Sequence, residues 1–259
     1  MPRLCANLSM MFNEVPFLER FEQAAKAGFP AVEFLFPYDY PAAELRKRLT
    51  DNGLKQVLFN GPPGDWSAGE RGIACLPGRV QEFRDSVKRA LDYAATLDCR
   101  LVHIMAGLAP AATSPVTLGA VYAVNLAWAA EEAGRAGVKL VIEPINHRDM
   151  PGYYLHTQEQ GAAIVEAIGR DHLGLQFDIY HCQIAQGDLT RRMQELMAVI
   201  AHMQLADVPK RNEPGTGEIA WEYVFRRIDE LGYEGWIGCE YRPAGNTLEG
   251  LGWRKRFGV

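Results

Sequence analysis

The amino-acid sequence predicts an α/β protein, a (β/α)8 TIM barrel of eight parallel strands surrounded by helices. Two observations lead to this prediction. Short apolar runs alternate with amphipathic stretches along the whole chain, and a glycine repeatedly ends a helical stretch just before the next apolar run. Eight such units in 259 residues fit the usual length of this fold, so we expect one domain over residues 1–259.

Eight apolar runs are expected to be the strands, because each is too short for an independent helix and is bounded by turn residues. They are residues 4–8, 31–35, 56–59, 101–104, 138–142, 173–177, 200–205 and 236–239. Their continuous apolar character is typical of parallel strands that are buried on both faces.

The segments between these runs are expected to be helices. They are long enough for the right-handed crossovers that parallel strands require. The expected helices are residues 14–27, 41–53, 79–97, a stretch from the loop 107–115 to about 136, and residues 157–168, 189–197 and 221–231. The tail, residues 248–259, is interrupted by glycine and gives the weakest helical pattern.

An open doubly wound sheet is the alternative architecture. That fold places a glycine-rich phosphate-binding turn after its first strand, and the sequence has no such turn there. The long connection 60–78 is unusual for a compact domain and suggests a functional loop over the site.

The composition excludes several classes of function. With a net charge of −5, we do not expect a large basic footprint for nucleic acid, which leaves open only a local basic patch. No apolar run approaches the ~20 residues that span a bilayer. The five cysteines lack metal-ligand spacing, which indicates reduced, buried thiols. The first residues lack a signal-peptide pattern. We therefore expect a cytoplasmic protein with neither nucleic acid nor a membrane as partner.

Polar residues mark the ends of the last four expected strands. Three runs lead into Glu143, Asp178 and Glu240, and the seventh carries Gln204. The C-terminal ends of barrel strands face one shared pocket, so these four side chains should converge. Three carboxylates and an amide suit Mg²⁺ or Mn²⁺ better than zinc, which prefers cysteine and histidine. We predict that they are metal ligands. The alternative for each acid taken alone is a structural ion pair.

Six segments of the sequence match one known family, and they are residues 59–66, 69–72, 141–146, 177–181, 214–218 and 238–243. Through these segments the sequence resembles the hydroxypyruvate isomerase family within the xylose-isomerase-like barrel superfamily. The resemblance runs through nearly the whole chain, and Gln204 matches the amide of this branch, where ketose 3-epimerases usually have histidine.

The resemblance implies an isomerase that interconverts hydroxypyruvate and 2-hydroxy-3-oxopropanoate (tartronate semialdehyde) through a metal-stabilised enediolate. Glu143 and Glu240 would be the catalytic base and acid while also binding the metal. His181 would donate a hydrogen bond to a substrate oxygen. The other five histidines receive no catalytic role; they are His103, His147, His156, His172 and His202.

A small 2-oxo or hydroxy acid substrate requires a cation for its carboxylate. Arg242 is the first choice because its fork binds carboxylates in a bidentate manner. Lys210, Arg211 and Arg71 are further candidates, although each alone is also explained as a solvated surface charge. Aromatic side chains are candidates for the pocket wall, equally explained by ordinary packing; they are Trp66, Phe36 and Tyr241.

Other functions share parts of this pattern. Isomerisation of a four-carbon 2-oxo acid (2-oxo-tetronate) and 3-epimerisation of a ketose use the same ligands and intermediate. A zinc-dependent DNA-repair enzyme on this barrel would need more histidines at strand ends, and a non-catalytic binding protein would not need two opposed glutamates. The sequence leaves the oligomeric state open. Barrels of this group commonly pair into a homodimer or higher homo-oligomer, and Trp221, Tyr223 and the tail are candidates for such an interface.

Overall fold

The computed structural model describes residues 2–259, in which eight parallel strands close into one barrel. The strands follow each other in chain order around the barrel, and the last one pairs with the first. They are β1 (Arg3–Asn7), β2 (Ala31–Phe34), β3 (Lys55–Asn60), β4 (Leu101–His103), β5 (Lys139–Ile142), β6 (Leu173–Asp178), β7 (Ile200–Leu205) and β8 (Trp236–Cys239). The predicted (β/α)8 barrel is confirmed.

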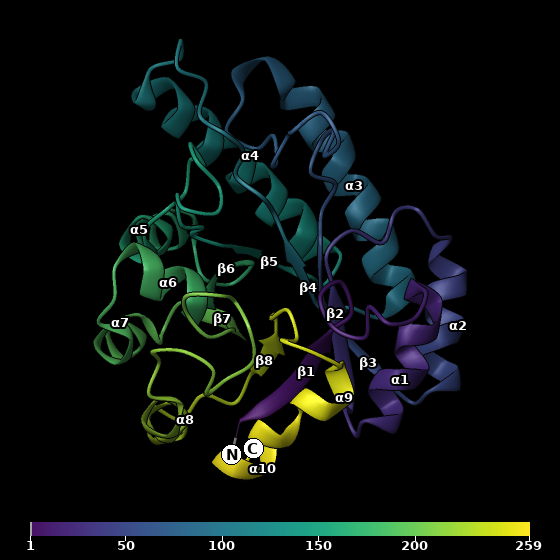
Figure 1. Cartoon of the computed structure of the whole chain (residues 1–259). Coiled ribbons are helices and arrows are strands. Elements are labelled where there is room, and N and C mark those ends of the chain that lie inside the picture. Colours follow the sequence, from purple (N-terminus) through teal and green to yellow (C-terminus); the bar gives the residue numbers. More distant parts are fainter. Residues whose placement is uncertain (1) are drawn as a thin grey trace.

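The helices surround the strands, and both chain ends lie together beneath β1 and β8 (Figure 1). The helices between successive strands are α1 (Arg20–Lys26), α2 (Ala42–Asp51), α3 (Val80–Leu97), α4 (Pro115–Arg135), α5 (Gln158–Ile168), α7 (Leu189–Leu196) and α8 (Trp221–Glu230). The further helical segments are the 3-10 turns η1 (Phe17–Glu19) and η2 (Pro77–Arg79), and α6 (Ile179–Ala185), α9 (Thr247–Gly250) and α10 (Gly252–Phe257).

Amphipathic spacing explains how the outer helices pack. In α8, Trp221, Val224, Phe225 and Ile228 are buried, while the residues between them face outward. These positions recur every three or four residues, so they form one apolar stripe against the barrel. Among residues 2–259, no helix combines the length and the apolar character needed to cross a membrane.

One helix was not predicted from the sequence. The structure has α6 directly after β6, where we expected a loop leading to the helix at 189–197. The side chain of Asp178 accepts hydrogen bonds from the backbone N–H groups of Tyr180 and His181, so it caps α6 without any intervening turn. The strand therefore passes into a helix within one residue, which leaves no loop signal in the sequence.

Strand alternation divides the barrel interior into an apolar and a polar layer. A small apolar cluster comprises Cys5, Ala31, Val57, Leu58 and Val141. Two residues further along the strands, buried polar side chains take over, among them Asn7, Glu33 and Glu143. The candidate site is thus placed at the C-terminal end of the barrel.

Candidate active site

Three acidic side chains and one histidine meet at the C-terminal ends of β5, β6 and β8. Glu143 directly follows β5, Asp178 ends β6 and Glu240 directly follows β8. One ligand atom from each of them and one from His181 all lie within 4.8 Å of one another, and all four residues are buried. We call these four residues the carboxylate cluster. It unites three of the four predicted metal ligands with the predicted substrate-contacting histidine.

The two side-chain oxygens of Asp178 have different roles, one in capping a helix and one in the site. Its Oδ1 accepts the backbone N–H groups of Tyr180, at 2.7 Å, and His181, at 3.3 Å. Its Oδ2 is buried and has no hydrogen-bond partner among residues 2–259. Glu143 Oε1 is buried without a partner in the same way. Unpaired buried carboxylate oxygens are costly, so both atoms are available to a cation.

The hydrogen bonds around His181 fix its tautomer. The backbone N–H of Asn146 donates to His181 Nδ1 at 3.4 Å, and the Asn146 side-chain amide lies 2.6 Å from the same nitrogen. Because a backbone N–H can only donate, Nδ1 is the acceptor and Nε2 carries the hydrogen. Burial lowers the pKa of His181 well below its usual value, so the ring is neutral. Its Nε2–H lies 3.7 Å from Asp178 Oδ2 and faces the cluster.

Arg211 is the cation that enters the carboxylate cluster. Its guanidinium donates to Glu240 Oε2 and lies 3.5 Å from Asp178 Oδ2 and 4.8 Å from the Tyr180 ring. Burial would lower its pKa, but Glu240 and Asp178 raise it and keep the side chain charged. The sequence placed Arg211 only among four candidate cations, because its position after β7 does not reveal that it turns inward.

Burial raises the pKa of all three carboxyl groups in the cluster. For Glu143 the rise is large, because the charges of Glu240 and Asp178 add to the effect of burial. For Glu240, burial raises the pKa to about 8 against the opposing charge of Arg211. Arg211 also opposes the rise at Asp178. A divalent cation would relieve the same repulsion by favouring the ionised forms.

Gln204 lies next to Asp178 across the β6–β7 pairing, as its predicted role requires. Its Nε2 donates to Glu33 Oε1 at 2.8 Å, and its Oε1 accepts from Gln176 Nε2 at 2.6 Å. It is 2% exposed, so the amide is shielded from bulk solvent. Its role as a metal ligand stays a prediction.

His103 lies beside Glu143, with its Nδ1 3.7 Å from Glu143 Oε2. Burial lowers its pKa to about 3, so the ring is neutral. Neither ring nitrogen has a hydrogen-bond partner among the residues that the structure describes. Sequence reasoning assigned His103 no role. The sequence did offer a signal for such a role, because His103 ends β4 and strand alternation points its side chain into the barrel.

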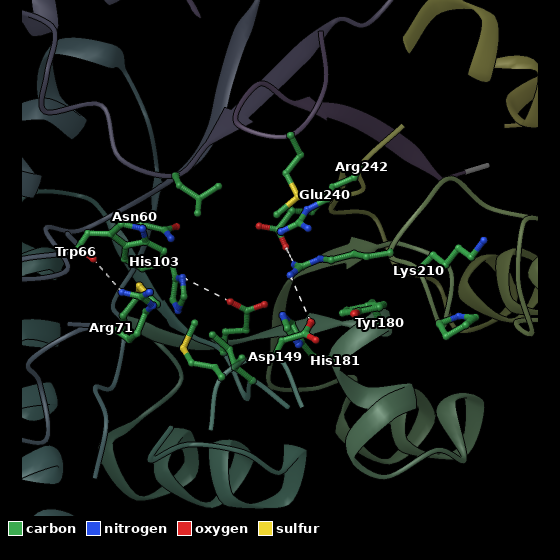
Figure 2. Close-up of a pocket in the computed structure, with 18 residues that line it drawn as sticks. Asn60, Trp66, Arg71, His103, Asp149, Tyr180, His181, Lys210, Glu240 and Arg242 are labelled. Carbon is green, nitrogen blue, oxygen red and sulfur yellow. Dashed lines mark hydrogen bonds and ion pairs between the residues drawn. The ribbon is translucent and has the colours of Figure 1, made fainter. Parts of the chain in front are cut away.

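A cavity of about 520 Å³ opens above the carboxylate cluster. Trp66, Arg71 and His103 lie on one side of it and Lys210 and Arg242 on the other (Figure 2). All of the predicted substrate-binding residues therefore line it, including His181.

The cationic side chains that line this cavity differ in how many contacts they already make with the protein. Arg71 is held by the loop 60–78: its guanidinium lies 3.9 Å from the Trp66 ring centroid and donates to the carbonyl oxygens of Trp66 and Glu70. Within residues 2–259, the side chains of Lys210 and Arg242 make no hydrogen bond or ion pair, so both are free to receive an anion.

Two aromatic side chains expected in the cavity wall lie elsewhere. Tyr241 is fully buried, and its hydroxyl accepts from Trp253 in the packing beneath the C-terminal helices. Phe36 packs behind Trp66 at 5.0 Å between ring centroids and does not reach the cavity. The prediction for Tyr241 was wrong because strand alternation points it away from the barrel axis, opposite to Glu240.

Comparisons with known proteins agree with this arrangement. A family model described as a xylose isomerase-like TIM barrel matches residues 21–257. The chain therefore belongs to the xylose isomerase-like TIM barrel family.

Its relatives within that family carry isomerase names. The chain is 54% identical to a 2-oxo-tetronate isomerase of Cupriavidus necator, over 99% of both chains. It is 47% identical to the hydroxypyruvate isomerase of Escherichia coli, over 98% of both. The enzyme class expected from the sequence, an isomerase, is confirmed by these relatives. A crystal structure titled AP endonuclease, family 2, from Brucella melitensis is 47% identical, with a TM-score of 0.96 over 99% of both chains.

The raised pKa of Glu240 predicts how the metal-free protein responds to pH. The carboxyl titrates at about 8 in the folded state and near 4.3 in an unfolded chain, so the folded state binds the proton more tightly. This contribution to stability is complete below about pH 4 and is lost as the pH rises toward 8. With a chelator present, we expect the melting temperature to fall over this range, and to fall less in Glu240→Gln.

Thermal melts at a series of pH values would measure this effect. The exposed Glu222 offers a matched control, since Glu222→Gln should follow the wild-type curve. Identical pH profiles for the wild type and Glu240→Gln would show that the Glu240 carboxyl does not hold the extra proton.

Proposed function

We propose that this chain isomerises short hydroxylated 2-oxo acids, with hydroxypyruvate as the first candidate and the four-carbon 2-oxo-tetronate as the second. The observation that carries the proposal is the pair Glu143 and Glu240, buried beneath a cavity whose rim bears free cations. The relatives named hydroxypyruvate isomerase and 2-oxo-tetronate isomerase support both substrates. Ketoses lack the carboxylate that these cations would bind.

The residues present fit a divalent cation. Oxygen donors dominate the carboxylate cluster, and two of those oxygens, on Glu143 and Asp178, are buried without a hydrogen-bond partner. Glu143, Asp178, Glu240 and Gln204 would hold the ion, and this oxygen-rich set suits Mg²⁺ or Mn²⁺. When bound, the ion would supply Lewis-acid stabilisation of negative charge on the substrate oxygens.

The isomerisation moves one proton between adjacent carbons. In hydroxypyruvate, a base removes a proton from C3, and an acid delivers a proton to C2. The hydroxyl proton on O3 passes to O2, so the carbonyl moves from C2 to C3 and the atoms balance. Glu143 and Glu240 would take these roles, because both line the cavity and burial raises the pKa of each carboxyl group, which favours proton exchange with a substrate. The Nε2–H of His181 would donate to a substrate oxygen and hold the reacting carbons in place.

The substrate carboxylate would bind at the rim of the cavity. Arg242 and Lys210 are the best candidates because neither has a competing partner among residues 2–259. Arg211 is occupied by Glu240 and Asp178, and Arg71 is stacked on Trp66. The large cavity accommodates three- and four-carbon acids alike, so its volume does not favour one of them.

Cytoplasmic location and assembly into a homo-oligomer are further parts of this proposal. Five buried, unpaired cysteines support a reducing compartment.

Tyr223 is 45% exposed on α8 and stays a candidate for an interface. Trp221 is 1% exposed and packs within the chain itself, so its predicted place at an interface was wrong.

The proposal predicts that both glutamates are needed for turnover. Glu143→Gln and Glu240→Gln should each lower kcat on hydroxypyruvate by about 10²- to 10⁴-fold, because each removes one proton-transfer group. The same assay with 2-oxo-tetronate and a set of ketoses, with and without a chelator, would rank the substrates. Full activity in both folded variants, or activity confined to ketoses, would contradict the proposal.

Arg242 is predicted to act in binding rather than in chemistry. Arg242→Met should raise KM for hydroxypyruvate by about 10- to 100-fold, the loss expected for a charge-assisted hydrogen bond, with little change in kcat. Arg100→Met is a matched control, since Arg100 precedes β4 at the opposite end of the barrel. An unchanged KM in Arg242→Met would assign carboxylate binding to another cation.

A further inference from the structure

A second polar group lies inside the barrel beneath the carboxylate cluster, centred on Glu33 of β2. Glu33 is fully buried, and its two oxygens receive four donors. Oε1 accepts from Asn7 Nδ2 at 2.9 Å and from Gln204 Nε2 at 2.8 Å. Oε2 accepts from His202 Nε2 at 2.7 Å and from the Cys5 thiol at 3.6 Å. A carboxylate this deep is tolerated only with such complete pairing.

Glu33 reaches across the barrel to make these contacts. Its partner Gln204 is 171 residues away in the sequence, on β7, and two strands, β1 and β8, separate β7 from β2 around the barrel. The side chain passes over Gly238 of β8, where a Cβ atom would overlap the Glu33 carboxylate. The absence of a side chain at 238 thus creates the space in which Glu33 meets Gln204.

This contact determines which way the Gln204 amide points. A carboxylate only accepts hydrogen bonds, so Gln204 must turn its NH₂ toward Glu33 and its oxygen away from it. The oxygen receives Gln176 Nε2 at 2.6 Å. Gln204 is paired with Asp178 of the carboxylate cluster across β6 and β7, so the amide lies beside that cluster.

We propose that Glu33 is a positioning residue that holds the Gln204 amide with its oxygen toward the metal site. Only the oxygen of an amide binds a hard cation; a flipped Gln204 would present its NH₂ and repel the ion. This role rests on the proposed function, because it requires that Gln204 be a metal ligand. Outer partners of this kind orient ligands at many metal sites.

The same residues do not form a separate metal site. Cys5, Glu33 and His202 also bring ligand atoms within 4.8 Å of one another. However, the His202 nitrogen that faces the group is engaged by Glu33 Oε2, and Glu33 Oε1 is shared by two amides. The ligand atoms of this group are already used in hydrogen bonds to one another, so the group is suited to positioning Gln204 rather than to binding an ion.

Titration with Mn²⁺, followed by the paramagnetic resonance signal of free Mn²⁺, tests the proposal without relying on activity. Glu33→Gln should bind Mn²⁺ about 10- to 100-fold more weakly than the wild type, because the amide of Gln204 loses its fixed orientation. The exchanged variant Glu33→Gln/Gln204→Glu should recover binding, since residue 33 then donates to a carboxylate that supplies the ligand oxygen. Gln56→Met changes another buried polar side chain of the barrel and should leave the affinity unchanged.

Each outcome decides between the proposals. Wild-type affinity in Glu33→Gln would overturn the positioning role and leave the proposed function intact. A loss that the exchanged variant does not reverse would assign Glu33 to packing alone and would also overturn it. No binding by the wild type would remove the metal from the proposed function, and the positioning role with it. If Glu33→Gln does not fold, Glu33→Asp keeps the charge but withdraws from Gln204, and the same loss is expected.

Discussion

The mutual repulsion of three buried carboxylates is the interaction on which the rest of this structure depends. Glu143, Asp178 and Glu240 approach one another at the strand ends, where little water reaches them. Charges so placed are unstable unless they are protonated, paired or bound to a cation. Among residues 2–259, Arg211 pairs with Glu240 and Asp178, and two carboxylate oxygens, on Glu143 and Asp178, have no hydrogen-bond partner. The cluster therefore has more negative than positive charge, which favours the binding of a metal ion or of protons.

The surrounding residues hold the side chains of the carboxylate cluster in place despite their repulsion. Asp178 is fixed because one oxygen caps α6, and His181 is fixed because Asn146 donates to its Nδ1. Deeper in the barrel, Glu33 is also buried, and its carboxylate is fully satisfied by four donors. Glu33 and the carboxylate cluster thus differ in role. Glu33 has all of its hydrogen bonds made within the chain, whereas the carboxylate cluster has oxygens available to a ligand.

The sequence predicted the fold and the carboxylate cluster because both follow from local patterns. Apolar runs and their terminal acids are neighbours in the chain, so Glu143, Asp178 and Glu240 could be placed at strand ends without coordinates. The contacts of Glu33 could not be predicted, because they join β2 to β7 across the barrel and depend on a glycine in β8. Arg211 was indistinguishable from its exposed neighbour Lys210, since only the loop conformation turns it inward.

The most direct test of this account is the location of a bound ion. Crystals grown with Mn²⁺ should show a single anomalous-scattering peak within bonding distance of Glu143, Asp178 and Glu240, with the side-chain oxygen of Gln204 as a further ligand. Such a peak would place the cation where the buried carboxylates lack partners. No peak at the carboxylate cluster, or one held instead by Cys5, Glu33 and His202, would contradict the account.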